Sequence, residues 1–141
     1  MSRCGYDNDC DSQEALWAAI RWAGAVNSAV KGRRGQALLR CLRDTLDAMP
    51  EKVLCADSLE SDGQFCTLGV ECHARGIDVR DLHPQDHRAI ASVLDAAPAL
   101  VREIAFQNDE WGDFFETPEQ RWARMRRWVD EKIQEPTGRM P

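Results

Sequence analysis

The sequence predicts a mainly α-helical fold: a single small domain of about five helices, with one candidate β-hairpin. Three observations lead to this prediction. Apolar residues recur every three or four positions along most of the chain, which is the spacing of one face of a helix. Proline and glycine divide these stretches into segments of helical length. The 141 residues, 43% hydrophobic and 30% charged, have the composition of a globular protein that buries its own core.

The first predicted helix begins after Asp11 and runs to about Lys31. Asp11 supplies a capping oxygen, and Glu14 follows at the capping-box position. We expect one face of this helix to point toward the core, and its residues are Leu16, Ile20, Ala23, Val26 and Val30. Trp17 and Trp22 broaden the apolar surface, which would suit a homodimer as well as a core.

A link of five residues is expected between the first helix and the second. Gly32 is predicted to end the first helix, because glycine readily takes the positive φ of a helix C-terminus. The second helix ends before Pro50, and its apolar positions are Leu38, Leu39, Leu42, Leu46 and Met49. So short a link predicts that the two helices are neighbours, either antiparallel or steeply crossed.

In the segment that follows, the spacing of apolar residues is no longer helical. Residues 52–56 and 64–68 flank the turn pair Asp62-Gly63, which predicts a β-hairpin. The alternation of apolar and polar residues is imperfect. Residues 68–74 therefore fit a short helix that ends at Gly76 equally well.

Prolines mark the helices of the second half. Pro84 is expected in the first turn of a helix whose inward residues are Ile90, Val93, Leu94 and Ala97. Pro98 begins another helix, with inward residues Leu100, Val101, Ile104 and Ala105. Thr117 is expected to cap the last helix, with Gln120 at the capping-box position. That helix ends near Glu135.

These elements form one predicted globular domain at residues 12–135, between a flexible acidic arm at 1–11 and a frayed tail at 136–141. The N-terminus is polar and the apolar runs are short, so we expect a cytosolic protein without a membrane span. In that compartment cysteines are expected to be free thiols. The six cysteines are Cys4, Cys10, Cys41, Cys55, Cys66 and Cys72.

Basic residues gather in two clusters, although the net charge is −6. The side chains suited to a phosphate backbone or an acidic partner are Arg33, Arg34 and Arg40 in the first cluster and Arg124 and Arg127 in the second. The region 16–49 is similar to a helix-turn-helix, which predicts a nucleic-acid-binding regulator as an alternative function. The acidic total and the long apolar face of the second helix argue against it.

A third hypothesis is a zinc-stabilised domain. Cys66, Cys72, His83 and His87 carry the donor atoms that zinc prefers, in the pattern Cys-x5-Cys-x10-His-x3-His. The cysteines are spaced too widely for a zinc knuckle, and His83 precedes Pro84, outside the helix that contains His87. The alternative is a half-buried hairpin cysteine, a helix cysteine and two surface histidines. No other cofactor is expected.

Residues 108–116 are predicted to form an acidic loop that contains aromatic side chains. Its candidate interaction residues are Asp109, Glu110, Trp111, Asp113, Phe114 and Phe115. The aromatic rings either fold back on the core or form an exposed anchor for a protein partner, and both interpretations stay open. The loop lacks the ligand order of a calcium site, and the sequence contains no Gly-rich phosphate loop or nucleophile elbow. We therefore expect no enzyme activity.

One set of short motifs extends over most of the chain. They are Gly32-Arg33-Arg34-Gly35-Gln36, Asp62-Gly63-Gln64-Phe65-Cys66-Thr67-Leu68-Gly69, Ala74-Arg75-Gly76-Ile77-Asp78, Arg102-Glu103-Ile104 with Asn108-Asp109-Glu110, and Thr117-Pro118-Glu119-Gln120-Arg121-Trp122. In these motifs the chain resembles a family of small uncharacterised proteins from tailed phages and prophages. The resemblance carries over no functional residue. It implies a protein of the cytoplasm of an infected or lysogenic bacterium.

In that setting we expect a non-enzymatic accessory protein that acts by protein–protein interaction and inhibits or modulates a host complex, such as a defence complex. This expectation rests on analogy with other proteins from the same biological context, and not on particular residues. The expected partner is a host protein or a ribonucleoprotein complex. Nucleic acid is the alternative partner, and a homodimer is compatible with the first helix.

Overall fold

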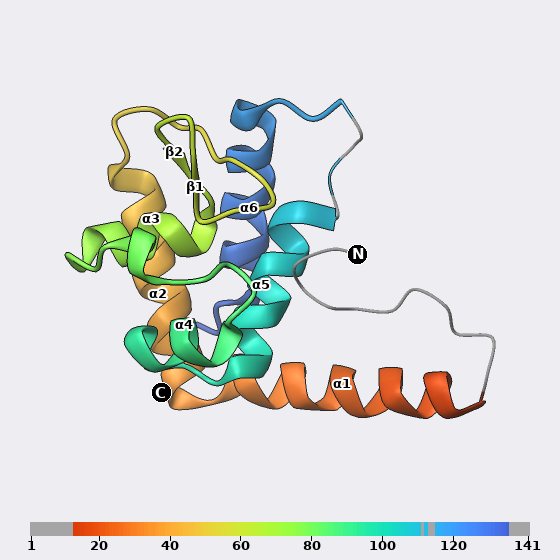
Figure 1. Ribbon diagram of the computed structural model, residues 1–141. Helices are drawn as coiled ribbons and strands as arrows, with labels where there is room; N and C mark the ends of the chain where they lie inside the picture. The colour runs from red at the N-terminus through yellow and green to blue at the C-terminus, as the bar shows by residue number, and fades with distance from the viewer. Residues whose placement is uncertain (1–12, 111, 113–114, 136–141) are drawn as a thin grey trace.

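The computed structural model describes residues 13–110, 112 and 115–135. In these residues the chain forms six α-helices, one 3-10 helix and one antiparallel hairpin, which confirms the predicted mainly helical single domain. The elements in chain order are α1 (Gln13–Lys31), α2 (Arg33–Ala48), β1 (Glu60–Ser61), β2 (Gln64–Phe65), α3 (Thr67–Ala74), η1 (Val79–Asp81), α4 (His87–Leu94), α5 (Pro98–Glu110) and α6 (Pro118–Lys132) (Figure 1). The predicted arm and tail lie outside the described residues.

Helix α2 is the central element of the core. It packs against α6, α3 and α1, while α5 packs against α1, α3, α4 and α6. The four buried leucines of α2 are each at most 1% exposed, and they are Leu38, Leu39, Leu42 and Leu46. Their helical spacing places them on one apolar face. The predicted inward face of this helix is therefore confirmed.

The junction between α1 and α2 differs from the prediction. Only Gly32 separates the two helices, and its φ of −68° is extended rather than positive, so it caps the start of α2. The expected five-residue link and the positive φ were wrong. The helices meet so closely because Gly35 has no side chain. A Cβ at Gly35 would lie 1.8 Å from the carbonyl oxygen of Ala29 in α1.

Gln36 joins the ends of two helices through one buried side chain. Its Nε2 donates to the carbonyl oxygens of Val30 at 2.7 Å and Lys132 at 3.0 Å. Its Oε1 accepts a hydrogen bond from the backbone N–H of Gln134 at 2.7 Å. The last carbonyl groups of a helix have no partner within the helix. Gln36 therefore satisfies such groups in both α1 and α6.

The β-hairpin forms at the predicted turn but with a different first strand. Asp62 and Gly63 have φ values of 52° and 80°, the left-handed conformation that a two-residue hairpin turn requires. The turn therefore pairs the residues directly beside it, and residues 52–56 form no strand. Instead, the backbone N–H of Leu54 donates to the carbonyl oxygen of Pro118 at 3.1 Å, at the start of α6.

The alternative prediction of a short helix at 68–74 is confirmed by α3. The thiol sulfur of Cys66 caps this helix. A buried amide then ties α3 to α5: Oδ1 of Asn108 accepts from the backbone N–H and the hydroxyl of Thr67, at 3.1 and 2.8 Å. Nδ2 of Asn108 donates to the carbonyl oxygen of Cys55 at 2.9 Å. One side chain thus fixes the hairpin segment and α3 on the end of α5.

Side-chain caps set the starts of α4 and α6. Helix α4 begins at His87 rather than at Pro84, because the Asp86 carboxylate caps it by accepting a hydrogen bond from the backbone N–H of Ala89 at 3.1 Å. Helix α6 begins as predicted. The side chain of Thr117 accepts from the backbone N–H of Gln120, and the Gln120 side chain accepts from the backbone N–H of Thr117.

Candidate functional site

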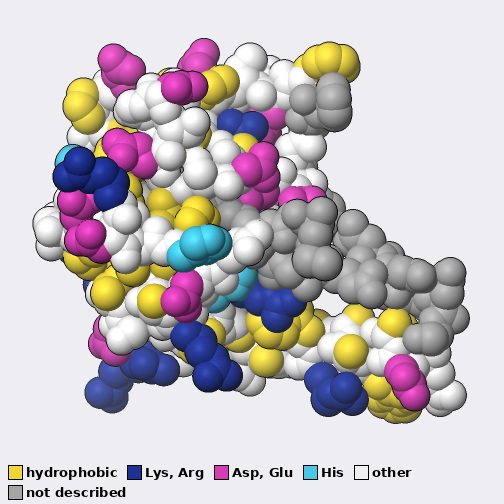
Figure 2. Space-filling view, in the orientation of Figure 1, with side chains coloured by type: hydrophobic (Ala, Val, Ile, Leu, Met, Phe, Trp, Pro, Cys, Tyr) yellow, Lys and Arg dark blue, Asp and Glu magenta, His cyan; other side chains and the backbone are white. Residues whose placement is uncertain are grey.

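The first basic cluster lies at the start of α2. Arg33 and Arg34 are exposed. Arg34 Nη1 lies 3.5 Å from Oδ1 of Asp95, and Arg40 Nη2 donates to the carbonyl oxygen of Gln134 at 2.7 Å. Figure 2 shows Lys and Arg side chains along the lower edge of the molecule, where α1 and α2 meet. Two of the three predicted side chains thus have partners within the chain.

The two residues of the second basic cluster differ in their surroundings: Arg124 is bonded within the fold, and Arg127 faces solvent. The Arg124 guanidinium donates to the Glu116 carboxylate at 2.6 and 2.9 Å and to the carbonyl oxygens of Gln107 at 2.6 Å and Asn108 at 3.2 Å. The Glu116 side chain is only 7% exposed. Arg124 therefore holds the end of α5 against α6. Arg127 is exposed.

The acidic and aromatic loop predicted at residues 108–116 starts later than expected, because α5 continues to Glu110. The ring of Phe115 is exposed, and Glu110 is exposed at the end of α5. Oδ1 of Asp109 accepts a hydrogen bond from the backbone N–H of Asp57 at 3.0 Å. Asp109 thus contributes to the fold. The other three candidates lie outside the described residues: Trp111, Asp113 and Phe114.

The structure does not bring the four candidate zinc ligands together. Cys66 and Cys72 are completely buried around α3. His83 is exposed, and its Nδ1 accepts from the backbone N–H of Gln85 at 3.1 Å. His87 is half-buried in the first turn of α4. Within the part of the chain that the structure describes, no three His, Cys, Asp or Glu side chains form a group that could hold a metal ion.

Burial predicts a large difference in the reactivity of the thiols. Cys41 is exposed, whereas Cys55, Cys66 and Cys72 are buried. Burial also raises the pKa of the Cys72 thiol to about 11, because the thiolate loses its hydration. We expect iodoacetamide at pH 8 to alkylate Cys41 at least about a hundredfold faster than Cys66 or Cys72, which react only when the core opens. Peptide mapping by mass spectrometry measures each rate.

Denaturant provides the control, since it should make these thiols react at similar rates. Prior treatment with a chelator should leave the protection of Cys66 and Cys72 unchanged. Loss of protection after chelation would instead support the zinc hypothesis.

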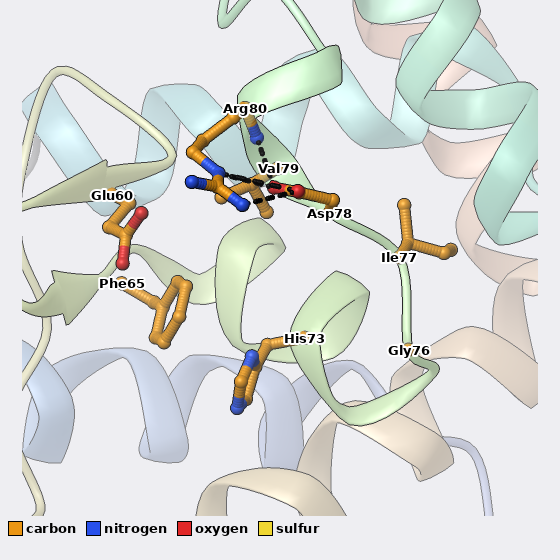
Figure 3. A pocket seen from close by; sticks show the side chains of 8 residues that line it. All are labelled: Glu60, Phe65, His73, Gly76, Ile77, Asp78, Val79 and Arg80. Atoms are coloured by element: carbon orange, nitrogen blue, oxygen red, sulfur yellow. Dashed lines mark hydrogen bonds and ion pairs between the residues drawn. The ribbon is translucent and has the colours of Figure 1, made fainter.

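A cleft of about 460 Å³ lies between the hairpin and the segment from α3 to η1 (Figure 3). It is lined by Glu60, Phe65, His73, Gly76, Ile77, Asp78, Val79 and Arg80. The rings of Phe65 and His73 stack with their centroids 4.7 Å apart. Arg80 Nη2 lies 2.8 Å from Oδ2 of Asp78, and Figure 3 shows the guanidinium between Asp78 and Glu60.

Two charged groups in this cleft, Asp78 and Arg80, are paired with each other. The pKa of the Asp78 carboxyl is lowered to about 2, because the side chain and backbone N–H of Arg80 donate to it. The pair is therefore charged at neutral pH, beside the flat surface of Phe65 and His73. None of the eight lining residues is Ser, Thr, Cys or Lys. The sequence analysis missed the cleft because no single motif spans the hairpin, α3 and η1.

The largest departure from the sequence analysis concerns α1. Of its predicted inward residues, only Val30 is buried, and Val26 is half-buried. Leu16, Trp17 and Ile20 are 50%, 53% and 53% exposed. The prediction that this stripe joins the core was therefore wrong for Leu16 and Ile20, and also for Ala23, which is exposed. We call the side chains of Leu16, Trp17 and Ile20 the α1 apolar face.

The residues of α1 that are seen to contact the described core lie in the second half of the helix. There the indole ring of Trp22 lies under the Arg102 guanidinium of α5, with the guanidinium carbon 4.4 Å from the ring centroid. Val26, Ala29 and Val30 face the core on the same side as Trp22. Figure 1 shows the first half of α1 projecting beyond the other helices.

Exposed large apolar residues that lie next to one another usually mark a contact with another molecule. Tryptophan is among the residues that contribute most to such contacts. None of the described helices has both the length and the apolar composition that a membrane span requires. No protein-family model, curated protein or solved structure matches this chain, so its function has to be inferred from its own residues.

Proposed function

We propose that this protein acts without catalysis, by binding another protein, and that the α1 apolar face forms the contact. The single observation that supports this proposal is the exposure of Leu16, Trp17 and Ile20, each half accessible to solvent. Burying one such side chain contributes about 1.5 to 3 kcal/mol relative to leaving it in water. A helix that keeps three of them exposed is stabilised by a partner that covers them.

The charges beside the face define the chemistry of that partner. Glu14 and Arg21 are exposed on α1 and are the charged residues of its first half. A matching partner offers an apolar strip with a basic group near Glu14 and an acidic group near Arg21. Amphipathic helices commonly bind one another in this way, with side chains at helical spacing as anchors.

The resemblance to phage proteins supplies a setting for the proposal. In a bacterial cell the target is a host protein or a ribonucleoprotein complex, and inhibition of a defence complex is one form that the interaction takes. The alternative is a regulator that binds nucleic acid through the basic region. It has weaker support, because Arg34 and Arg40 contact Asp95 and Gln134 within the chain.

A pull-down from a bacterial lysate, with and without nuclease, tests the proposal. We expect the tagged protein to capture a protein in stoichiometric amount, and to lose it when Leu16 and Ile20 are both changed to Asp. Val93→Asp is the matched control: Val93 on α4 was wrongly predicted to face inward, and it is a 39% exposed apolar residue. It should capture the partner normally.

Two results would contradict the proposal. Capture that is unaffected by the double Asp variant would separate the interaction from α1. Nucleic acid that co-purifies, with every protein partner lost after nuclease, would favour the nucleic-acid-binding alternative. In that case binding should weaken steeply with salt and on changing Arg33 to Glu.

A further inference from the structure

We propose that the α1 apolar face binds the same face of a second copy of this chain, with the two helices antiparallel. This inference rests on the proposed function, because it takes the face to be a protein-binding surface, and it makes a second copy of the chain the partner there in place of a host protein. The partner chemistry derived above is an apolar strip beside one acidic and one basic group. The first half of α1 itself has this chemistry.

The charges on α1 are self-complementary. Glu14 and Arg21 are the only charged residues between positions 13 and 30, and both are exposed. They are seven residues apart, which is about two helical turns, so they lie on the same edge of the helix. In an antiparallel pair the same edges of the two helices face each other. Glu14 of each copy then lies opposite Arg21 of the other, as two-fold symmetry requires.

This pairing also fixes the register of the apolar side chains. Placing Glu14 opposite Arg21 puts the crossing point between Trp17 and Ala18. Leu16, Trp17 and Ile20 then lie within one turn of the crossing point in both copies, and each set covers the other. A parallel pair in register would place the charged edges of the two copies on opposite sides of the contact, so Glu14 could not pair with Arg21 of the other copy.

The part of the fold that the structure describes leaves room for this arrangement. Helix α1 contacts the core through its second half, at Trp22, Val26, Ala29 and Val30. In an antiparallel pair the second halves point in opposite directions. The two cores therefore lie at opposite ends of the paired segment, beyond the projecting part of α1 that Figure 1 shows.

The size of the contact predicts a weak dimer. About three turns of each helix overlap, which buries on the order of a few hundred Å² per protomer. A standard stable interface buries about 800 Å² per partner. We therefore expect a dissociation constant in the micromolar range. Sedimentation velocity at about 1 to 200 μM covers that range, and the average mass should rise toward twice that of one chain.

Charge variants test the antiparallel pairing. Glu14→Arg places two arginines opposite two arginines, and Arg21→Glu places two glutamates opposite two glutamates. Each variant alone should dimerise about tenfold more weakly, because two weak attractions become repulsions. An equimolar mixture of the two should dimerise as well as the original protein, since each copy then carries the opposite charge. The double variant should also be restored.

Arg33→Glu is the control, because it makes the same change of charge outside α1 and should leave the dimer unchanged. Circular dichroism checks that each variant keeps its helices. Ile20→Asp should abolish the dimer. A protein that stays monomeric over the whole range, or a mixture that dimerises no better than Glu14→Arg alone, overturns the inference.

The failure of this inference can be distinguished from that of the proposed function. The protein could be monomeric and still lose its captured partner when Leu16 and Ile20 are both changed to Asp. That result would support the proposed function and show that the face binds a different protein. A monomeric protein that captures no partner overturns both.

Discussion

Replacing Gly35 with alanine is expected to lower the free energy of unfolding by about 3 kcal/mol, the upper end of what overpacking usually costs. The new Cβ would lie 1.8 Å from the carbonyl oxygen of Ala29 and 2.9 Å from its carbonyl carbon. Both are backbone atoms, so no side chain can turn away. Helices α1 and α2 must separate, and the hydrogen bond from Gln36 to Val30 is strained with them. Urea unfolding measures the change.

Gly24→Ala is the matched control for this prediction. Gly24 also lies in a helix, but a Cβ there would meet nothing within 4 Å. Alanine favours a helix over glycine by about 1 kcal/mol, so this variant should be neutral or more stable. Equal free energies of unfolding for the two variants would show that the close contact at Gly35 does not make alanine destabilising there.

Removing the Asn108 side chain is expected to cost about 3 kcal/mol as well. Asn108 is 1% exposed, and Asn108→Ala leaves three buried groups without their partner: the N–H and hydroxyl of Thr67 and the carbonyl of Cys55. Each unpaired buried group costs about 1 to 3 kcal/mol, and water that enters the space recovers part of this. The hairpin and α3 should loosen together, which amide exchange at Thr67 would detect.

Asn27→Ala, at an exposed position of α1, controls for the loss of an asparagine and should change stability by less than about 0.5 kcal/mol. Thr67→Val adds a stronger test. Because Thr67 and Asn108 share a hydrogen bond, the double variant should cost at least about 1 kcal/mol less than the sum of the single variants. Additive costs would mean that the two residues stabilise the fold independently.

Local patterns predicted the elements that depend on neighbouring residues. Thr117 and Gln120 cap α6 as expected because a capping box needs only four consecutive residues. The Asp62-Gly63 turn was located for the same reason. The strand that pairs across it was placed too early, since the apolar run at 52–56 suggested a strand that the core does not use.

Contacts between distant segments were the part that sequence patterns could not supply. Helical periodicity shows that Leu16 and Ile20 share a face, but it cannot show whether another element of the fold covers that face. Arg124 was predicted to face a partner, and its contact with Glu116 is visible only once α5 and α6 are adjacent. Asn108 did leave a signal, because it continues the inward spacing of Ile104 and Ala105.

The projection of α1 also affects how the molecule unfolds. A helical segment of about ten residues without tertiary contacts is only marginally stable in water. Because Leu16, Trp17 and Ile20 are half exposed, we expect the amide hydrogens in the first three turns of α1 to exchange faster than those of α2. A partner that binds this segment must also keep it helical. The conformational entropy that the segment loses on ordering makes the binding free energy less favourable. Warming should then release the partner well before the core melts.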